Sequence, residues 1–146
     1  MSLIELTDIS KFYEMGNQTV RALDGVNVSI NKNEYVAFIG SSGSGKSTML
    51  NILGCLDKPT SGRYLLNGAN VESLGQNALS EIRNLEIGFI FQSFNLLPRA
   101  TALGNVMQPL IYRNVPYGRR KELALTALRR VNLADRTDHL PNQFSG

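Results

Sequence analysis

The sequence predicts an α/β fold that places a small antiparallel sheet first, a strand-loop-helix unit next and a helical segment last. Three observations support this order. Apolar residues alternate with period two between residues 4 and 30, and a continuous apolar run at 35–39 leads into glycine-rich sequence. Residues 101–130 then show helical spacing with no strand between the helices.

The composition of the chain limits the classes of protein to which it can belong. The chain has 146 residues, of which 42% are hydrophobic, and is therefore sized for one globular domain. Its 15 basic and 12 acidic residues give a mild net charge of +3, and the basic clusters at 119–121 and 129–130 indicate solvated helix faces, not a nucleic-acid surface. The single cysteine, Cys55, is expected to be buried on a helix in a protein of a reducing compartment. No apolar run is long enough to cross a bilayer, so membrane association is expected only through a partner.

The alternation of apolar residues between residues 4 and 30 is interrupted by turn signals at Gly16-Asn17 and Asp24-Gly25. A hairpin is expected from residues 62–66 and 69–71, because Asn67-Gly68 supplies the positive φ angles of a type I′ turn. These segments predict the antiparallel sheet.

Two continuous apolar runs, residues 35–39 and 87–91, predict strands that are buried on both faces. Helical spacing of apolar residues predicts four helices. They are expected at 46–56, at 77–85, and on either side of a break near 114–116 within 101–130.

A glycine-rich motif follows the first buried run. It consists of Gly40, Ser41, Ser42, Gly43, Ser44, Gly45, Lys46 and Ser47 and satisfies the pattern G-x-x-x-x-G-K-[ST]. Glycines let successive backbone N–H groups surround phosphates, and the N-terminus of the following helix favours anions. Lys46 is placed to reach the β- and γ-phosphates, and the Ser47 hydroxyl to bind Mg²⁺. The alternative interpretation of this motif is a Gly-Ser surface turn before a helix, with no phosphate-binding role.

This motif alone does not separate transporter ATPases from GTPases, small-molecule kinases, helicases or recombinases. Two longer runs narrow the class: GSSGSGKSTMLNILGCLDKPTSG at 40–62 and IGFIFQSFNLLP at 87–98. They resemble the ABC transporter ATPases, in particular the branch that contains macrolide exporters and lipoprotein-releasing ATPases. The resemblance extends over the whole chain, from the LxxISKFYxxG run at 6–16 to the HLPNQFSG run at 139–146.

This resemblance implies a P-loop NTPase fold of the ABC ATPase type. The expected parts are an antiparallel β subdomain (1–34 and 62–72), a P-loop core (35–61 and 73–92) that lacks the later core strands, and a truncated helical subdomain (93–146).

The resemblance also implies roles for individual residues. Tyr13 matches the aromatic residue that stacks on adenine, although from the sequence alone it would more often be a core or rim aromatic. Gln92 matches the glutamine that helps to bind Mg²⁺ or to position water and that senses the transporter partner; without the resemblance it is a polar strand cap. Thr48 joins the nucleotide-binding residues, and Lys46 and Gln92 are the expected catalytic residues. ATP and Mg²⁺ are the expected cofactors.

Ser145 and Gly146 resemble the start of the signature sequence, which contacts the γ-phosphate of ATP held by the opposite subunit of a dimer. The family's acidic strand, the glutamate beside it and the switch histidine have no counterpart in this chain, so it is expected to bind ATP but to hydrolyse it poorly alone. His139 precedes the signature and is expected to be structural.

Two positions depart from the family pattern. Asn33 replaces a glycine, which is tolerated because asparagine accepts the left-handed conformation. Gly104 replaces a glutamate, so Thr101 lacks the reciprocal half of a capping box.

The implied function is an ATP-binding subunit that couples hydrolysis to transport. Its expected partners are transmembrane permease subunits and a second copy of itself, as a homodimer with ATP at the interface, and it is expected to be cytoplasmic and peripheral at the inner face of the cell membrane. No nucleic-acid partner is expected. Two alternatives stay open, a soluble ABC-type ATPase that acts on DNA or the ribosome and a nucleotide-binding module without catalysis.

Overall fold

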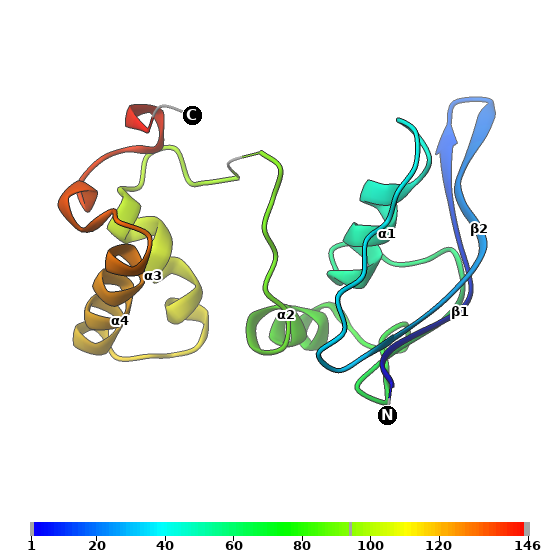
Figure 1. Ribbon diagram of the computed structural model, residues 1–146, viewed down its shortest axis with the longest axis horizontal. Coiled ribbons are helices and arrows are strands. Elements are labelled where there is room, and N and C mark those ends of the chain that lie inside the picture. The colour runs from blue at the N-terminus through cyan, green and yellow to red at the C-terminus, as the bar shows by residue number, and fades with distance from the viewer. Residues whose placement is uncertain (1, 94, 145–146) are drawn as a thin grey trace. The chain divides into compact units, whose positions relative to one another are not determined.

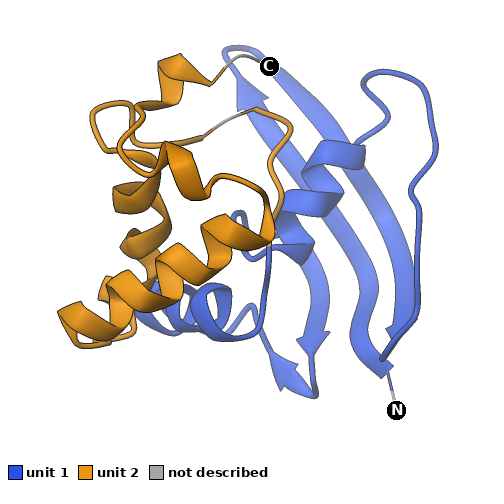
Figure 2. Cartoon of the chain, turned by 60° about the vertical axis from the view of Figure 1, so that its left-hand side comes forward, with its two compact units in different colours: residues 1–88 blue, residues 89–146 orange. Residues whose placement is uncertain are grey.

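The computed structural model describes residues 2–93 and 95–144 of the chain. They form two compact units, residues 1–88 and residues 89–146, which Figure 2 distinguishes by colour. The first unit contains a sheet and two helices, and the second contains helices.

The sheet of the first unit is built around a long hairpin. Strands β1 (Ser2–Met15) and β2 (Gln18–Asn31) pair antiparallel across the turn at Gly16-Asn17, as the turn signal predicted. On its other edge β1 pairs antiparallel with β3 (Ser61–Leu66), which in turn pairs with β4 (Ala69–Asn70). The strand order is therefore β2-β1-β3-β4, and Figure 1 labels the hairpin of β1 and β2.

The second predicted turn, at Asp24-Gly25, is wrong. Both residues lie inside β2, which continues to Asn31. The register between β1 and β2 shifts on both sides of the Ile9–Val26 pair, and Gly25 donates its N–H to the Ser10 hydroxyl at 3.0 Å. Asp24 and Gly25 therefore form part of a β-bulge and not a turn, because an antiparallel pair tolerates an extra residue and a local bend.

The predicted turn between β3 and β4 is confirmed. Asn67 has φ 50° and Gly68 has φ 81°, the two positive values that a type I′ turn requires. Asn33, which replaces the family's glycine, also has a positive φ of 64° and follows the end of β2, as expected.

Helix α1 (Lys46–Leu53) ends three residues earlier than its apolar pattern predicted. The N–H of Cys55 donates to the Ile52 carbonyl at 3.0 Å, and the N–H of Leu56 donates to the Asn51 carbonyl at 2.8 Å. These two bonds form a Schellman motif, in which the residue after the cap takes the left-handed conformation. That residue is Cys55, with φ 53°, so the buried cysteine lies in the turn after the helix and not on it.

Helix α2 (Gln76–Leu85) confirms the helix predicted at 77–85 and buries Leu79. The core of the first unit lies between the sheet and these two helices. Its buried members are Leu6, Ile9, Leu23, Met49, Ile52, Cys55, Tyr64, Leu66, Val71 and Leu79.

The strands predicted at 35–39 and 87–91 are not present as strands. Both segments are irregular, and Tyr35, Ile39 and Ile90 are 96%, 95% and 97% exposed. A strand needs a neighbour for its N–H and C=O groups. Within the described part of the chain all paired strands belong to the β2-β1-β3-β4 sheet, so neither segment has such a neighbour. Phe38 and Ile87 nevertheless pack against the core.

The second unit contains helices α3 (Ala102–Tyr112) and α4 (Tyr117–Arg130), followed by the short 3₁₀ helices η1 (Ala134–Arg136) and η2 (Pro141–Gln143). The predicted break near 114–116 is confirmed, with Asn114 in the left-handed conformation at φ 53°. Met107 on α3 and the pair Ala124 and Leu128 on α4 are the buried side chains of the helix pair.

The start of α3 has half of a capping box. Thr101 is the N-cap, and its hydroxyl oxygen accepts a hydrogen bond from the N–H of Gly104 at 3.1 Å. Glycine has no side chain to return the bond to the backbone of Thr101.

We predict that Gly104→Glu stabilises the second unit. The change replaces a glycine in the first turn of α3, where glycine costs up to about 1 kcal/mol, and completes the capping box. There is room, because a Cβ at this position would lie 3.4 Å from the Thr101 hydroxyl oxygen and 3.5 Å from the Ala100 methyl. Thermal unfolding of this variant should be compared with that of Gly104→Ala, which removes the glycine penalty alone. If the unfolding midpoint of Gly104→Glu were equal to or lower than that of the unchanged chain, the capping geometry would be contradicted.

Candidate functional site

The phosphate-binding motif forms the loop that precedes α1, and Lys46 is the first residue of that helix. The N-cap is Gly45, and no side chain caps the first turn of α1. The amide groups at this end of the helix are therefore open to an external acceptor, and the helix dipole favours an anion there.

The Lys46 side chain reaches back over the loop. Its Nζ atom donates to the carbonyl oxygens of Gly40 at 2.9 Å and Ser41 at 2.6 Å, and lies 3.2 Å from the Ser44 hydroxyl. The loop thus curves around a single positive charge, which a bound phosphate would share with the surrounding backbone amides.

Other atoms approach closely at two glycines of the loop, and at Gly45 the close atom belongs to the backbone, so glycine is required there. A Cβ on Gly40 would lie 2.5 Å from the Ser44 hydroxyl oxygen. A Cβ on Gly45 would lie 2.4 Å from the carbonyl oxygen of Ala22 in β2, and Gly45 also has φ 86°. The end of the loop at Gly45 therefore lies directly on the backbone of the sheet.

The structure brings the predicted phosphate-site residues together, since the motif forms one loop at the start of one helix. The loop residues Ser41, Ser42, Gly43 and Ser44 are exposed. Ser47 is exposed in the first turn of α1, whereas Thr48 is half-buried beside it. A hydroxyl at the position of Ser47 is the type of hard oxygen ligand that Mg²⁺ accepts.

Tyr13 lies on β1, opposite Val20 of β2, and is 36% exposed. Its hydroxyl donates a hydrogen bond to Oδ2 of Asp57 at 2.9 Å, and the Nζ atom of Lys11 lies 5.0 Å from the centre of its ring. This distance is within the range of a cation–π interaction. The ring is therefore held at its edge and on one face, and remains partly open to solvent.

Lys11 and Asp57 were not predicted as site residues. The Lys11 Nζ atom forms an ion pair with Oδ1 of Asp57 at 2.7 Å and also donates to the Lys58 carbonyl at 2.7 Å. The Thr60 hydroxyl accepts from the N–H of Phe12 at 2.9 Å, which fixes the same turn to β1. Lys11 and Tyr13 are two residues apart on one strand, and that spacing is the only sequence signal for their shared partner.

The charge state of this cluster follows from its contacts. Burial raises the pKa of Asp57, but the hydrogen bonds from Lys11, Tyr13 and the Lys58 N–H outweigh this effect and hold the pKa below its usual value. Burial, followed by the hydrogen bond to Asp57, raises the pKa of Tyr13, so the phenol keeps the proton that it donates.

The remaining predicted residues lie elsewhere. Gln92 belongs to the second unit, in an exposed irregular segment, and Ser145 and Gly146 lie outside the described residues. His139 is half-buried, and its carbonyl accepts from the N–H of Ala102 at 2.8 Å, so its backbone supports the start of α3. Among residues 2–93 and 95–144, no group of three or more His, Cys, Asp or Glu side chains is placed to hold a metal ion.

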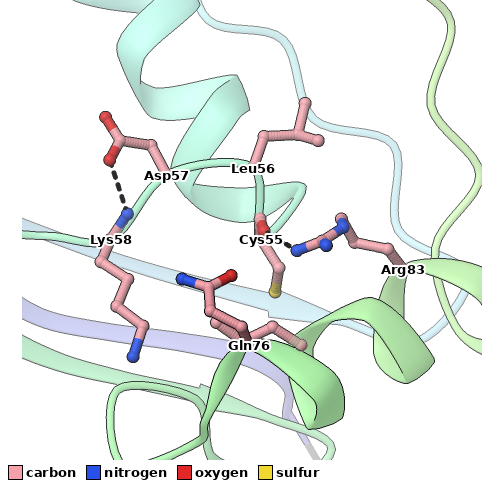
Figure 3. Close-up of a pocket in the computed structure, with 7 residues that line it drawn as sticks. Cys55, Leu56, Asp57, Lys58, Gln76 and Arg83 are labelled. Carbon is pink, nitrogen blue, oxygen red and sulfur yellow. Dashed lines mark hydrogen bonds between the residues drawn. The ribbon is translucent and has the colours of Figure 1, made fainter.

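A concave region lies between the end of α1 and α2, with a volume of about 280 Å³ (Figure 3). Its lining residues are Cys55, Leu56, Asp57, Lys58, Gln76, Leu79 and Arg83. Arg83 donates to the Cys55 carbonyl at 2.8 Å, and Lys58 donates to the Leu74 carbonyl at 2.8 Å. These cations thus support the turn after α1.

No helix in the described part of the chain is long and apolar enough to span a membrane.

The contact between Gly45 and β2 yields a prediction. Gly45→Ala and Gly43→Ala both place a side chain at a positive φ, which costs about 1–2 kcal/mol, but a Cβ at Gly43 has open space around it. Gly45→Ala adds a clash with the β2 backbone of roughly 1–3 kcal/mol and should unfold at a clearly lower temperature. Calorimetry of both variants measures the difference. Equal midpoints would mean that the loop does not rest on β2.

The Asp57 contacts yield a pH prediction. Because the folded pKa of Asp57 is lowered, its contribution to stability is present above the usual value of 3.8 and is lost as the pH falls through the folded pKa. The stability difference between the unchanged chain and Asp57→Asn should therefore be greatest near neutral pH and should diminish in acid. Denaturant unfolding at a series of pH values measures it, with Asp24→Asn as the control for an exposed ion pair. A difference that stays constant with pH would contradict the assignment.

Residues 23–146 of the chain match the ABC transporter family. An uncharacterized ABC transporter ATP-binding protein of Thermotoga maritima is 52% identical over 144 residues, which cover 99% of this chain and 62% of that protein. The macrolide export ATP-binding/permease protein MacB of Brucella abortus is 48% identical over 144 residues, or 99% of this chain and 22% of MacB. The dimeric post-hydrolysis structure of the ATP-binding cassette MJ0796, bound to ADP and Pi, aligns with a TM-score of 0.90 at 43% identity and covers 97% of this chain and 63% of that one. With this match and the loop around Lys46, the chain belongs to the ABC transporter family as an ATP-binding domain with the fold of an ABC ATPase cassette.

Proposed function

We propose that this chain binds Mg-ATP, with the phosphates in the loop of residues 40–47 and the adenine on Tyr13. The observation that carries the proposal is the position of the Lys46 ammonium, held 2.9 and 2.6 Å from two carbonyl oxygens of its own loop. A triphosphate is the ligand that suits a cation held beside a helix N-terminus whose amide groups no side chain caps.

Each residue of the site contacts a different part of Mg-ATP. Lys46 contacts the β- and γ-phosphates, the loop glycines and serines surround them, and Thr48 adds a hydroxyl in the first turn of α1. Ser47 would hold Mg²⁺, and Gln92 would help to bind Mg²⁺ or to position water. Mg²⁺ supplies neutralisation of the charge that develops on the phosphates during transfer.

Hydrolysis and transport are proposed for the whole protein, since the chain spans 62% of the Thermotoga relative. Two copies would close around ATP, with Ser145 and Gly146 reaching the nucleotide of the partner copy. A dimer is supported by the dimeric cassette structure, and a permease partner by MacB, which is named as an ATP-binding and permease protein. The protein would then lie on the cytoplasmic face of the membrane as part of an exporter.

The test is the affinity of the 146-residue chain for a labelled ATP analogue with Mg²⁺. Lys46→Ala should weaken binding by roughly tenfold or more, because a charge-assisted hydrogen bond is lost. Lys32→Ala is the matched control, since Lys32 is an exposed lysine in the turn after β2. Equal affinity in Lys46→Ala and the unchanged chain would refute the proposed site.

A further inference from the structure

We propose that Lys11 and Asp57 are positioning residues for the base of the nucleotide: they hold the Tyr13 ring in one orientation and connect it to α1. This inference rests on the proposed function, because it assigns to Tyr13 the contact with adenine. Lys11 and Asp57 are then two further residues of the site. They determine how much of the affinity for the nucleotide comes from the contact with the base.

Both oxygens of the Asp57 carboxylate take part. Oδ1 accepts from Lys11 at 2.7 Å and from the Lys58 N–H at 2.8 Å, while Oδ2 accepts from the Tyr13 hydroxyl at 2.9 Å. A carboxylate is planar and rigid, so fixing one oxygen also fixes the direction of the other. The phenol of Tyr13 is therefore held by a group whose own orientation is already determined.

Lys11 restrains the same ring from a different direction. Its side chain is only 13% exposed, and its ammonium lies 5.0 Å from the ring centre. A cation over one face of an aromatic ring is attracted by the electrons of that face. The opposite face is then the one on which a base stacks, and a ring that swings away from this position loses both contacts.

Asp57 also connects the ring to the phosphate-binding helix. It follows the Schellman motif that ends α1, and its N–H donates to the Asn51 carbonyl at 3.2 Å. Figure 3 shows Asp57 and Lys58 in the turn directly after α1. Tyr13 is thus attached to the helix that begins with Lys46, so the base and phosphate contacts are joined through α1 within the first unit.

The experiment separates the base from the phosphates. Binding of ATP, ADP and inorganic tripolyphosphate to the 146-residue chain is measured for Asp57→Asn, Lys11→Met, Tyr13→Phe and Tyr13→Ala. Asp57→Asn and Tyr13→Phe should each weaken ATP and ADP by the same factor, about fivefold, and Lys11→Met by about threefold, whereas tripolyphosphate affinity should not change. Asp24→Asn is the control that removes an exposed ion pair with Arg21 and should leave all three ligands unaffected.

Coupling between the variants provides the decisive readout. Once Tyr13→Phe has removed the hydroxyl, Asp57→Asn should have a smaller further effect on ATP, and in Tyr13→Ala it should have none. If Asp57→Asn does not fold, Tyr13→Phe carries the test, because it removes the hydroxyl that donates to Oδ2 and leaves the Asp57 carboxylate and its bond to Lys11 in place.

Two results would overturn the inference. Loss of tripolyphosphate affinity in Asp57→Asn equal to the loss of ATP affinity would mean that Asp57 supports the loop in general. Normal ATP affinity in Asp57→Asn, Lys11→Met and Tyr13→Phe, with a loss in Tyr13→Ala, would remove the positioning role and leave the stacking contact in place. Unchanged ATP affinity in Tyr13→Ala would instead reject the adenine contact in the proposed function.

Discussion

The packing of helix α1 on the sheet is the interaction on which the site depends. Three side chains of the shared core, Ile9 on β1, Ile52 on α1 and Tyr64 on β3, have no exposed surface. Full burial of side chains of this size is worth about 1.5–3 kcal/mol each. Tyr64 also donates its hydroxyl to the Leu53 carbonyl at 2.9 Å, which anchors the last turn of α1. With the helix so placed, the phosphate loop at its start and the turn that contains Asp57 at its end both have fixed positions relative to β1.

Features with a short-range cause could be predicted from the sequence. The turn at Asn67-Gly68, the loop around Lys46 and the break between α3 and α4 each depend on the conformational preferences of a few adjacent residues. The helix that follows Thr101 likewise begins where a local cap predicts it. The family resemblance added the possible role of Tyr13, which no local pattern could supply.

Features with a long-range cause could not be predicted. The apolar runs at 35–39 and 87–91 have the composition of strands, but a strand also requires a paired neighbour, and apolar content does not reveal one. The contacts of Asp57 with Lys11 and Tyr13 cross 46 and 44 residues. In the sequence Asp57 was only a residue at which a helix stops. The helix in fact ends earlier, because Cys55 accepts a conformation that is usually taken by glycine.

The position of Cys55 has a chemical consequence. It is the one cysteine of the chain, is 4% exposed, and burial raises the pKa of its thiol. Alkylating reagents attack the thiolate, which is scarce and inaccessible in this environment. Labelling therefore requires the turn after α1 to open, so the rate of labelling measures how often it opens. The protein thus contains its own reporter of local unfolding at the point where the phosphate-binding helix joins the turn that holds Asp57.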